Sequence, residues 1–346
     1  MRIVIVTDAW HPQINGVVRT LETTRCCLVA EGHDVTIIAP DGFRTVGCPS
    51  YPEIRLSIAT PSAVGRIIRS AGADAIHIAT EGPLGWAAWR YCRRAGLTFT
   101  TSYHTAFPEY LSLRLPVRTA WLYAVLRRFH GAASNTMVAT PTIEARLRKQ
   151  GFANLVRWTR GVDVSLFRPI DTNDDALQPF AGLPRPIHLS VGRVAPEKSV
   201  EAFAALDLPG SRVVIGDGPS LPRFRSVFPS VHWLGARHGA DLARHIAAAD
   251  VFVFPSRTDT FGLVMLEALA CGVPVAANPV PGPLDLIGPD GQGVGALDTD
   301  LKTAIARALT ADRTRCRRFA EALSWERATQ QFVGNLRPAP VLANAA

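Results

Sequence analysis

Long apolar runs are missing from this sequence. No stretch approaches the ~20 consecutive apolar residues that a membrane-spanning helix needs. The amino-terminal run is interrupted at once by Asp8 and His11, which is atypical of a secretory signal peptide. Cysteine is also sparse, and the six cysteines form no C-x-x-C pair, which argues against a zinc site or a redox pair. Because reduced thiols are the default of the cytoplasm, we expect a cytoplasmic protein, soluble or peripheral on the cytoplasmic membrane face.

Lysine is scarce as well. Lys149, Lys198 and Lys302 are the three lysines of the chain, so nearly all of its basic charge is arginine. The net charge of +8 is uneven, since residues 1–168 hold 20 Lys or Arg against 11 Asp or Glu. So basic a half favours an anionic partner, such as a membrane surface, an acidic acceptor or nucleic acid. Charge that serves only solubility explains the excess equally well.

Short β-branched runs alternate with helix-length segments twice along the chain. Strands are predicted in the first half at residues 2–8, 34–40, 74–80, 97–103 and 135–140, and helices at 17–31, 83–95 and 142–150. The pattern restarts with runs at 187–192, 212–218, 231–235, 251–255 and 274–277. This alternation predicts an α/β chain with two doubly wound parallel sheets and a ligand cleft between the two halves. No G-x-G-x-x-G follows the first strand, which disfavours a dinucleotide-binding dehydrogenase.

Composition also predicts the domain limits. The segment rich in Pro and Asp reads as a linker between two domains, and the carboxyl-terminal residues read as a helix followed by a disordered tail. The expected order is a first domain at 1–168, a linker at 169–186, a second domain at 187–323, a terminal helix at 324–336 and a tail at 337–346.

Two acids stand out in the stretch 254–283, which reads as strand, polar loop, helix and strand. Glu267 lies among apolar residues of the helix, and a buried carboxylate needs partners. Asp259 lies eight positions earlier, in the loop at the amino end of that helix, where free amide groups attract anions and polar ligands. The acids either flank a hydroxyl-rich ligand or are a solvated loop Asp and a Glu on a half-exposed helix.

A second candidate site follows the first strand of the second half, in the segment Gly192-Arg193-Val194-Ala195-Pro196-Glu197-Lys198. Pro196 and Glu197 suit a helix start, so Arg193 and Lys198 flank a crevice between strand and helix. A fork-shaped Arg and a point-charge Lys together suit a diphosphate, although an ordinary basic loop has the same composition. Gly216 ends the next strand and predicts a turn near a nucleotide.

The first half holds weaker candidates. Gly16 opens a helix, where the amide groups favour phosphate, although a plain turn glycine is commoner. His104 ends a strand and faces the expected cleft, although a lone histidine is more often structural. Glu81 either meets an acceptor hydroxyl or caps the next helix. The segment 109–129 mixes aromatics with arginines, which is typical of a membrane-surface helix or of a buried helix with snorkelling arginines.

The pattern acid–seven residues–acid, with FGLV and LEA inside it and G-x-P-V after it, resembles the signature of the family 4 retaining glycosyltransferases, which have the GT-B fold. The G-R-x-x-x-E-K pattern is similar to the diphosphate clamp of this family. PSRTDTFG, ANPVPGP and SYHT look most like the branch of sulfoquinovosyl-diacylglycerol synthase and bacterial glycolipid synthases. Asp259 stands where the family usually has Glu, which shortens its reach by one methylene. The resemblance implies two Rossmann-like domains that face a central cleft, with the terminal helix crossing back to the first.

The resemblance also implies the activity and its residues. A retaining, metal-independent and cofactor-free hexosyltransferase would move sugar from a UDP- or GDP-linked donor to a lipid such as diacylglycerol. Arg193 and Lys198 would grip the diphosphate, Glu267 the ribose, Asp259 the sugar hydroxyls and His104 the reacting face. The donor-binding residues implied are Gly16, Gly192, Arg193, Lys198, Gly216, Asp259, Phe261, Gly262, Leu263, Val264 and Glu267.

Other functions stay open at this point. The acceptor could be soluble or a polysaccharide, and an epimerase or a phosphorylase can use the same fold. A non-catalytic binder of anionic lipid would explain the basic first half but has no use for Glu267 or for the pair of Arg193 and Lys198. Nucleic acid is the weaker option, because no recognition module appears. The residues do not distinguish UDP from GDP, and they do not give the oligomeric state.

Overall fold

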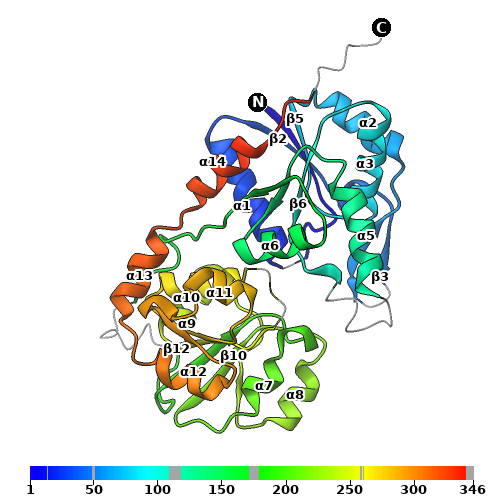
Figure 1. The fold of residues 1–346 in the computed structure, drawn as a ribbon. Coiled ribbons are helices and arrows are strands. Elements are labelled where there is room, and N and C mark those ends of the chain that lie inside the picture. Colours follow the sequence, from blue (N-terminus) through cyan, green and yellow to red (C-terminus); the bar gives the residue numbers. More distant parts are fainter. Residues whose placement is uncertain are drawn as a thin grey trace. The chain divides into compact units, whose positions relative to one another are not determined.

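The computed structural model describes residues 1–13, 15–48, 51–108, 118–170, 179–257, 259 and 261–339. The chain forms two compact units, which are described here separately (Figure 1). The first unit comprises Met1–Arg160 and Trp325–Ala346, and the second comprises Gly161–Ser324. Each unit has its own six-stranded sheet. The predicted α/β class with two Rossmann-like halves is confirmed.

The sheet of the first unit has the strand order β2-β1-β5-β6-β7-β8, and every neighbouring pair is parallel. Its strands are buried on both faces at the centre, which is why they read as continuous β-branched and apolar runs. The strands are β1 (Arg2–Val6), β2 (Asp34–Ile38), β5 (Ala75–Ile78), β6 (Thr100–Tyr103), β7 (Thr136–Val138) and β8 (Leu155–Arg157).

Helices cover the sheet of the first unit, and one of them comes from the far end of the chain. They are α1 (Gly16–Ala30), α2 (Pro61–Ser70), α3 (Pro83–Arg94), α5 (Thr119–His130), α6 (Pro141–Lys149) and α14 (Trp325–Asn335). The terminal helix α14 lies beside α1 (Figure 1). Its Phe332 is fully buried against Trp158, and the Asn335 amide donates to the Arg157 carbonyl at 2.7 Å. These contacts place α14 in the core of the first unit.

An antiparallel hairpin in the first unit was not predicted from the sequence. It consists of β3 (Thr45–Cys48) and β4 (Tyr51–Ser57) and follows the short 3₁₀ helix η1 (Pro40–Gly42). The hairpin stands where a doubly wound fold usually has a helix and a further parallel strand. Its two strands lie outside the six-stranded sheet, in a sheet of their own.

The sheet of the second unit has the order β11-β10-β9-β12-β13-β14, again with all neighbours parallel. This is the order of nucleotide-binding folds, and it reverses between β9 and β12, where ligands bind beyond the carboxyl ends of the strands. The strands are β9 (Ile187–Val191), β10 (Ser211–Ile215), β11 (His232–Trp233), β12 (Val251–Phe254), β13 (Val275–Ala277) and β14 (Gly295–Leu297).

Helix α10 is the central helix of the second unit, and it is buried from Met265 to Ala270. Arg317 donates to the carbonyl of Ala270 at 2.8 Å and so fixes its carboxyl end. The helical segments are η3 (Pro196–Lys198), α7 (Val200–Ala204), α8 (Leu221–Val227), α9 (Gly239–Ala247), α10 (Leu263–Ala270), α11 (Pro281–Ile287), η4 (Gly291–Gly293), α12 (Leu301–Ala308) and α13 (Arg313–Glu321).

The stretch 161–168 was expected at the end of the first domain, but it packs in the second unit. Val162 and Phe167 are buried in the same apolar core as α10. The hydrophobic contacts of these two residues therefore set the boundary before the proline-rich segment. Within the part of the chain that the structure describes, no helix is both long and apolar enough to cross a membrane.

Candidate functional site

The loops at the carboxyl ends of β9 and β10 are in direct contact. The amide of Gly192, which follows β9, donates to the carbonyl of Ile215 at 2.9 Å. Gly216 has φ 147°, and a Cβ at this position would lie 1.8 Å from the carbonyl oxygen of Gly192. A side chain at Gly216 would therefore push the two loops apart. This close approach keeps the backbone at the edge of the sheet bare, where a ligand can reach it.

Lys198 and Asp259 form an ion pair beside this edge. The Lys198 Nζ lies 2.7 Å and 2.8 Å from the two carboxylate oxygens of Asp259, although 61 positions separate the residues. Lys198 comes from the loop after β9 and Asp259 from the loop after β12, the two strands between which the strand order reverses. The Lys198 side chain is 32% exposed and that of Asp259 22%, so a ligand can reach both.

The electrostatics of Asp259 follow from this contact. Burial tends to raise the pKa of its carboxyl group. The charge and hydrogen bond of Lys198, with a hydrogen bond from Ser256, outweigh burial and hold the pKa below its usual value. Ser256 follows β12, and its single hydroxyl proton can be donated either to Asp259 or to the carbonyl of Glu197, 3.4 Å away. Arg193 lies half-buried in the loop that carries Lys198. The two residues predicted to bind an anion thus come from one loop, with an acid that holds Lys198 in place.

Glu267 is buried in α10, with 4% of its surface exposed, so it is no solvated surface residue. The helix begins at Leu263, directly after Gly262, which has φ 82°. A Cβ on Gly262 would lie 2.7 Å from Met265 Cε and 3.0 Å from the ring of Phe254, and with the positive φ a larger residue would be strained there. The first residues of α10, Leu263 and Val264, are half-buried, and the helix is fully buried from Met265 onward. The amide groups of that first turn therefore lie at a partly open, electropositive helix end.

His104 of the first unit is part of a hydrogen-bonded network. Arg160 Nη2 lies 3.2 Å from His104 Nδ1, and Ser102 Oγ lies 2.8 Å from His104 Nε2. Ser102 Oγ also lies 3.1 Å from His77 Nε2. Burial of the ring, with the positive charge of Arg160, holds the pKa of His104 well below its ordinary value. Sequence reasoning found His104 but missed Arg160, which is 56 positions away.

Gly16 is the first residue of α1, and its neighbour Asn15 already caps that helix. The Asn15 side-chain oxygen accepts hydrogen bonds from the amides of Val17 and Val18, each at 3.0 Å. Two of the free amides at the helix start therefore already have an acceptor. The candidate phosphate contact at Gly16 accordingly has fewer donors than the sequence suggested.

Asp8 was not among the candidates, yet it organises the carboxyl end of β1. Its carboxylate accepts from the amides of Leu84 at 2.8 Å and Gly85 at 3.1 Å, and from the Thr80 hydroxyl at 2.8 Å. Burial raises its pKa, against these three donors. A Cβ on Gly82 would lie 2.3 Å from the Asp8 carboxyl carbon. Asp8 thus joins β1 to the start of α3.

Glu81 binds a buried histidine rather than the start of α3. Its Oε1 lies 2.9 Å from His130 Nε2, and His130 Nδ1 lies 2.9 Å from the Thr101 hydroxyl. His130 is fully buried, whereas the Glu81 side chain is 18% exposed. No sequence pattern singles out His130, because its partners Glu81 and Thr101 come from two other parts of the fold.

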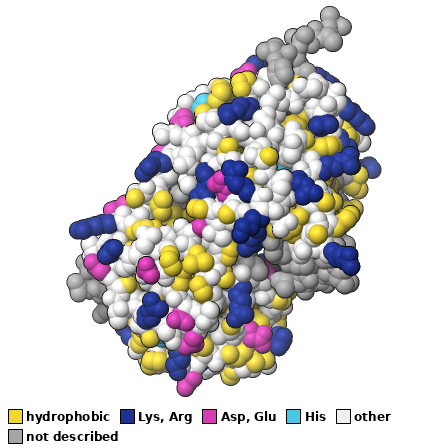
Figure 2. Space-filling view, in the orientation of Figure 1, with side chains coloured by type: hydrophobic (Ala, Val, Ile, Leu, Met, Phe, Trp, Pro, Cys, Tyr) yellow, Lys and Arg dark blue, Asp and Glu magenta, His cyan; other side chains and the backbone are white. Residues whose placement is uncertain are grey.

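Part of the segment 109–129 can be placed. Residues 109–117 lie outside the described residues, and the remainder forms most of α5. Leu122, Leu126 and Phe129 are buried, while Trp121 is 63% exposed. Helices α3 and α5 also line a depression of about 320 Å³ whose walls include Trp89, Arg93, Arg127 and Arg128. Figure 2 shows basic and hydrophobic side chains interspersed on the flank of the first unit where α3 and α5 lie.

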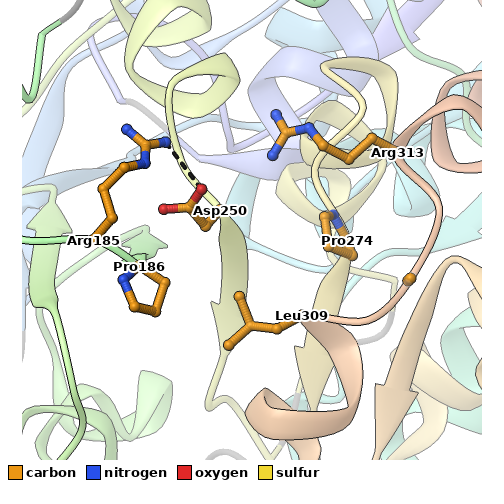
Figure 3. Close-up of a pocket in the computed structure, with 7 residues that line it drawn as sticks. Arg185, Pro186, Asp250, Pro274, Leu309 and Arg313 are labelled. Atoms are coloured by element: carbon orange, nitrogen blue, oxygen red, sulfur yellow. Dashed lines mark hydrogen bonds and ion pairs between the residues drawn. The ribbon is translucent and has the colours of Figure 1, made fainter.

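A larger depression of about 510 Å³ lies at the opposite edge of the second sheet (Figure 3). Pro186, Asp250 and Pro274 line it, and they precede β9, β12 and β13, so it faces the amino ends of the strands. Arg185 donates to Asp250 at 2.9 Å, and Arg313 donates to carbonyl groups just beyond α9. The two arginines therefore stabilise the end of α9. The loops that carry Lys198 and Asp259 lie at the other edge.

Across the described ranges, no three His, Cys, Asp or Glu side chains gather closely enough to hold a metal ion.

Two family models match this chain. Residues 14–166 match the model described as Glycosyltransferase Family 4, and residues 185–311 match Glycosyl transferases group 1. The first match falls on the unit with His104 and Arg160, and the second on the unit with Lys198, Asp259 and Glu267.

Curated relatives extend the likeness over nearly the whole chain. A GDP-mannose-dependent alpha-mannosyltransferase of Mycobacterium tuberculosis is 32% identical over 97% of this chain and 96% of its own length. The sulfoquinovosyl transferase SQD2 of Arabidopsis thaliana is 33% identical over 73% of this chain and 52% of its own length. An alpha-monoglucosyldiacylglycerol synthase of Acholeplasma laidlawii is 27% identical over 80% and 79%.

Solved structures with low sequence identity share the fold. Sucrose-phosphate synthase from Thermosynechococcus elongatus has a TM-score of 0.77 and 21% identity, over 96% of this chain and 97% of its own. Anabaena HepE in complex with UDP-glucose has a TM-score of 0.70 and 16% identity, over 96% and 98%. The lipopolysaccharide glycosyltransferase WaaG has a TM-score of 0.69 and 17% identity, over 95% and 98%. The predicted GT-B fold, with its two Rossmann-like halves, is confirmed.

Proposed function

We propose that this chain, which belongs to glycosyltransferase family 4, transfers a hexose from a nucleotide diphosphate sugar to the hydroxyl group of a lipid. Membership of this family makes the chain a glycosyltransferase that uses a nucleotide sugar. The proposed grip on the donor diphosphate rests chiefly on the ion pair of Lys198 and Asp259, at the point where the strand order of the second unit reverses, and the proposed lipid acceptor rests on the surface of α3 and α5. GDP-mannose is the first donor to test, because five curated relatives are named as dependent on it.

Lys198 and Arg193 are the proposed diphosphate ligands. The Lys198 ammonium has three N–H donors, and Asp259 oxygens lie within reach of two of them. The third remains for a phosphate oxygen, and Arg193 adds a planar fork suited to a second one. Charge grows on the diphosphate as the bond to the sugar breaks, so fixed cations here stabilise the transition state more than the ground state. Asp259 would keep Lys198 in place before the donor binds.

The remaining donor contacts are assigned by position. Glu267 is buried near the open end of α10, where its carboxylate would accept hydrogen bonds from the ribose hydroxyls. Asp259 and the amides of residues 261–264 would hold the sugar hydroxyls, with Gly192 and Gly216 letting the nucleotide approach the backbone. His104 and Gly16 are the proposed contacts from the first unit.

The proposed chemistry is retaining and needs no metal. The acceptor oxygen forms a bond to the anomeric carbon on the face from which the diphosphate leaves, and the acceptor proton passes to a diphosphate oxygen. The sugar carries positive charge in between, as in glycoside hydrolysis. The relatives' names support retention, since they describe alpha-mannosyl transfer and nucleotide-activated mannose is itself alpha-linked.

A lipid acceptor at an anionic membrane is supported by the surface of α3 and α5. Trp121 is exposed on α5, and Trp89, Arg93, Arg127 and Arg128 line the neighbouring depression. Exposed aromatics beside arginines bind the interface of anionic bilayers. Two relatives are named alpha-monoglucosyldiacylglycerol synthase, and two others are named as mannosyltransferases of phosphatidylinositol dimannoside. We propose that the protein works on the cytoplasmic face of the membrane with a lipid such as diacylglycerol.

One experiment tests the proposal. Purified protein is incubated with each of a panel of GDP- and UDP-sugars and a total lipid extract, and products are identified by mass spectrometry. We expect a hexosylated lipid with one donor, an alpha anomer by NMR, and unchanged yield in EDTA. An epimerised donor without lipid, or a demand for inorganic phosphate, would indicate the epimerase or phosphorylase alternative. Vesicle binding without turnover of any donor would leave only the non-catalytic lipid binder.

A further inference from the structure

We propose that Arg160 is a positioning residue: its guanidinium holds His104 as a neutral imidazole with the proton on Nε2. Only the role of His104 at the sugar rests on the proposed function. The protonation state itself is a property of the first unit and can be measured without any substrate.

Arg160 is firmly anchored. It is 5% exposed, and its Nη1 donates to the carbonyl oxygens of Trp158 at 2.7 Å and Thr159 at 3.0 Å. The guanidinium also lies 4.4 Å from the centre of the Trp158 ring, which is itself fully buried. Two carbonyls and one aromatic face therefore fix the plane of the guanidinium, and its second nitrogen, Nη2, points at His104.

The direction of the hydrogen bonds sets the tautomer. An arginine can only donate, so His104 Nδ1, 3.2 Å from Arg160 Nη2, must be the acceptor and carries no proton. The ring proton then lies on Nε2 and is donated to Ser102 Oγ at 2.8 Å. The Ser102 hydroxyl in turn donates either to the carbonyl of Ala79 at 3.2 Å or to His77 Nε2 at 3.1 Å. Both arrangements are compatible with a neutral His77, whose pKa is lowered to about 3, chiefly by burial.

The surrounding charges work in the same direction. The titratable groups that bear on His104 are Arg160, His77 and His130, and the carboxylate nearest to them in the network is Glu81, on His130. Among the described residues, no carboxylate pairs with Arg160, and burial lowers its pKa to about 9. A buried cation without a counter-ion is destabilising. Because Arg160 costs stability, its position beside His104 Nδ1 is better explained by its effect on the tautomer and charge of His104.

This arrangement defines what His104 can do. Both ring nitrogens take part in hydrogen bonds within the first unit, so His104 neither accepts nor gives a proton during transfer. It offers the sugar a ring of fixed orientation, and the acceptor proton leaves with the diphosphate. The rate of transfer should then show no ionisation of His104 between pH 5 and 8.

The tautomer is tested by NMR on the full chain labelled with ¹⁵N-histidine. The chain has nine histidines, and the spectrum of a His104→Gln variant identifies the signals of His104 by their loss. We expect a neutral ring with the proton on Nε2 that persists from pH 8 to pH 5.5. A proton on Nδ1, or a charged ring at pH 7, would overturn the proposal even if the enzyme were active.

Three substitutions separate the hydrogen bond from the charge. Arg160→Met removes both, Arg160→Gln keeps a donor, and Arg160→Lys keeps a donor and the charge. In Arg160→Met we expect His104 to populate both tautomers and its pKa to rise above that of the wild type, because the charge of Arg160 is gone while burial remains. We expect kcat at least tenfold lower and the KM for donor little changed. Arg160→Gln should restore the tautomer, and Arg160→Lys should restore it together with the low pKa. Arg148→Met, an exposed residue of α6, is the matched control.

The outcomes distinguish this proposal from the proposed function. If no donor is turned over by the wild-type chain, its histidine spectrum still decides the assignment. If transfer occurs but Arg160→Met keeps the wild-type tautomer and kcat, the positioning role is refuted and the transferase activity stands. Should Arg160→Met fail to fold, the wild-type spectrum and the Arg160→Gln variant give the same decision.

Discussion

The two units hold their charges in opposite ways. In the second unit, Lys198 and Asp259 neutralise each other, and both side chains are partly open to solvent. In the first unit, Arg160 is buried beside the neutral ring of His104, with no carboxylate on it among the described residues. An exposed ion pair can reorganise when a ligand arrives, whereas a buried network keeps one arrangement. We infer that the second unit adapts to the donor while the first presents a rigid surface.

The largest expected effect comes from removing the cations of the second unit. Lys198→Ala or Arg193→Ala should lose roughly 2–4 kcal/mol of transition-state binding, a rate loss of tens- to several-hundredfold. Because Lys198 is partly exposed, the free energy of unfolding should change little. The measurements are kcat/KM with the preferred donor and the thermal midpoint, with Arg223→Ala, an exposed residue ion-paired to Glu201, as control. Wild-type turnover in both variants would remove the diphosphate role.

Glu267 should come next, because it is the buried acid of the same unit. Each of the proposed hydrogen bonds from a ribose hydroxyl to its carboxylate would be worth about 1.5–3 kcal/mol. Glu267→Gln keeps the shape and removes the charge, so nucleotide affinity should fall at least tenfold while the fold is retained. Isothermal titration with GDP and UDP measures this, and Glu201→Gln on the exposed face of α7 is the control. Unchanged affinity for both nucleotides would contradict the ribose assignment.

Much of this site could be predicted from the sequence, because its signals are local. The runs that form β9 and β12 are β-branched, and the motifs with Lys198 and Asp259 directly follow them. Since parallel strands end at one edge of a sheet, the two motifs had to be neighbours. The ion pair between Lys198 and Asp259 could not be predicted from the sequence, because its geometry depends on how two loops fold against each other.

The network of the first unit could not be predicted for the same reason. Arg160 and His104 are 56 positions apart, and neither lies in a pattern that points to the other. Asp8 and the pair of Glu81 and His130 likewise depend on contacts between distant elements. The hairpin of β3 and β4 was missed because it is an antiparallel pair that lies outside the main sheet and breaks the alternation of strand and helix. Long-range side-chain partners are thus the part that sequence patterns leave open.

Acid should destabilise the first unit before the second. The pKa of His77 is lowered to about 3, first by burial and then by the charges of Arg160 and His130. The pKa of His104 is lowered as well. Below pH 6.5 these histidines therefore become protonated in the unfolded chain but stay neutral in the folded unit. The free energy of unfolding is full above pH 6.5 and falls as the pH drops towards 3. At pH 5 the loss for His77 alone is about 2 kcal/mol.

The second unit should lose less of its free energy of unfolding between pH 7 and pH 5. The lowered pKa of Asp259 contributes stability above pH 3.8, which is lost only as the pH falls further. His188 also has a lowered pKa, from burial, but the Ser211 carbonyl opposes the shift. Hydrogen exchange read by mass spectrometry at pH 7 and pH 5, corrected for intrinsic rates, should show a larger loss of protection in the first unit than in the second. Equal loss in both units would contradict the contrast drawn here.

Substitution of Asp259 should have the smallest effect and is the sharpest test of adaptability. Asp259→Glu adds one methylene and keeps the charge that holds Lys198, so kcat/KM should stay within about tenfold, since one exposed pair is worth about 1 kcal/mol or less. Asp259→Asn releases Lys198 and should cost more with every donor. The informative quantity is the ratio of kcat/KM for GDP-mannose to that for UDP-glucose. A ratio shifted by Glu but not by Asn would mean that the reach of the acid selects the sugar, and an unchanged ratio in both would limit Asp259 to holding Lys198.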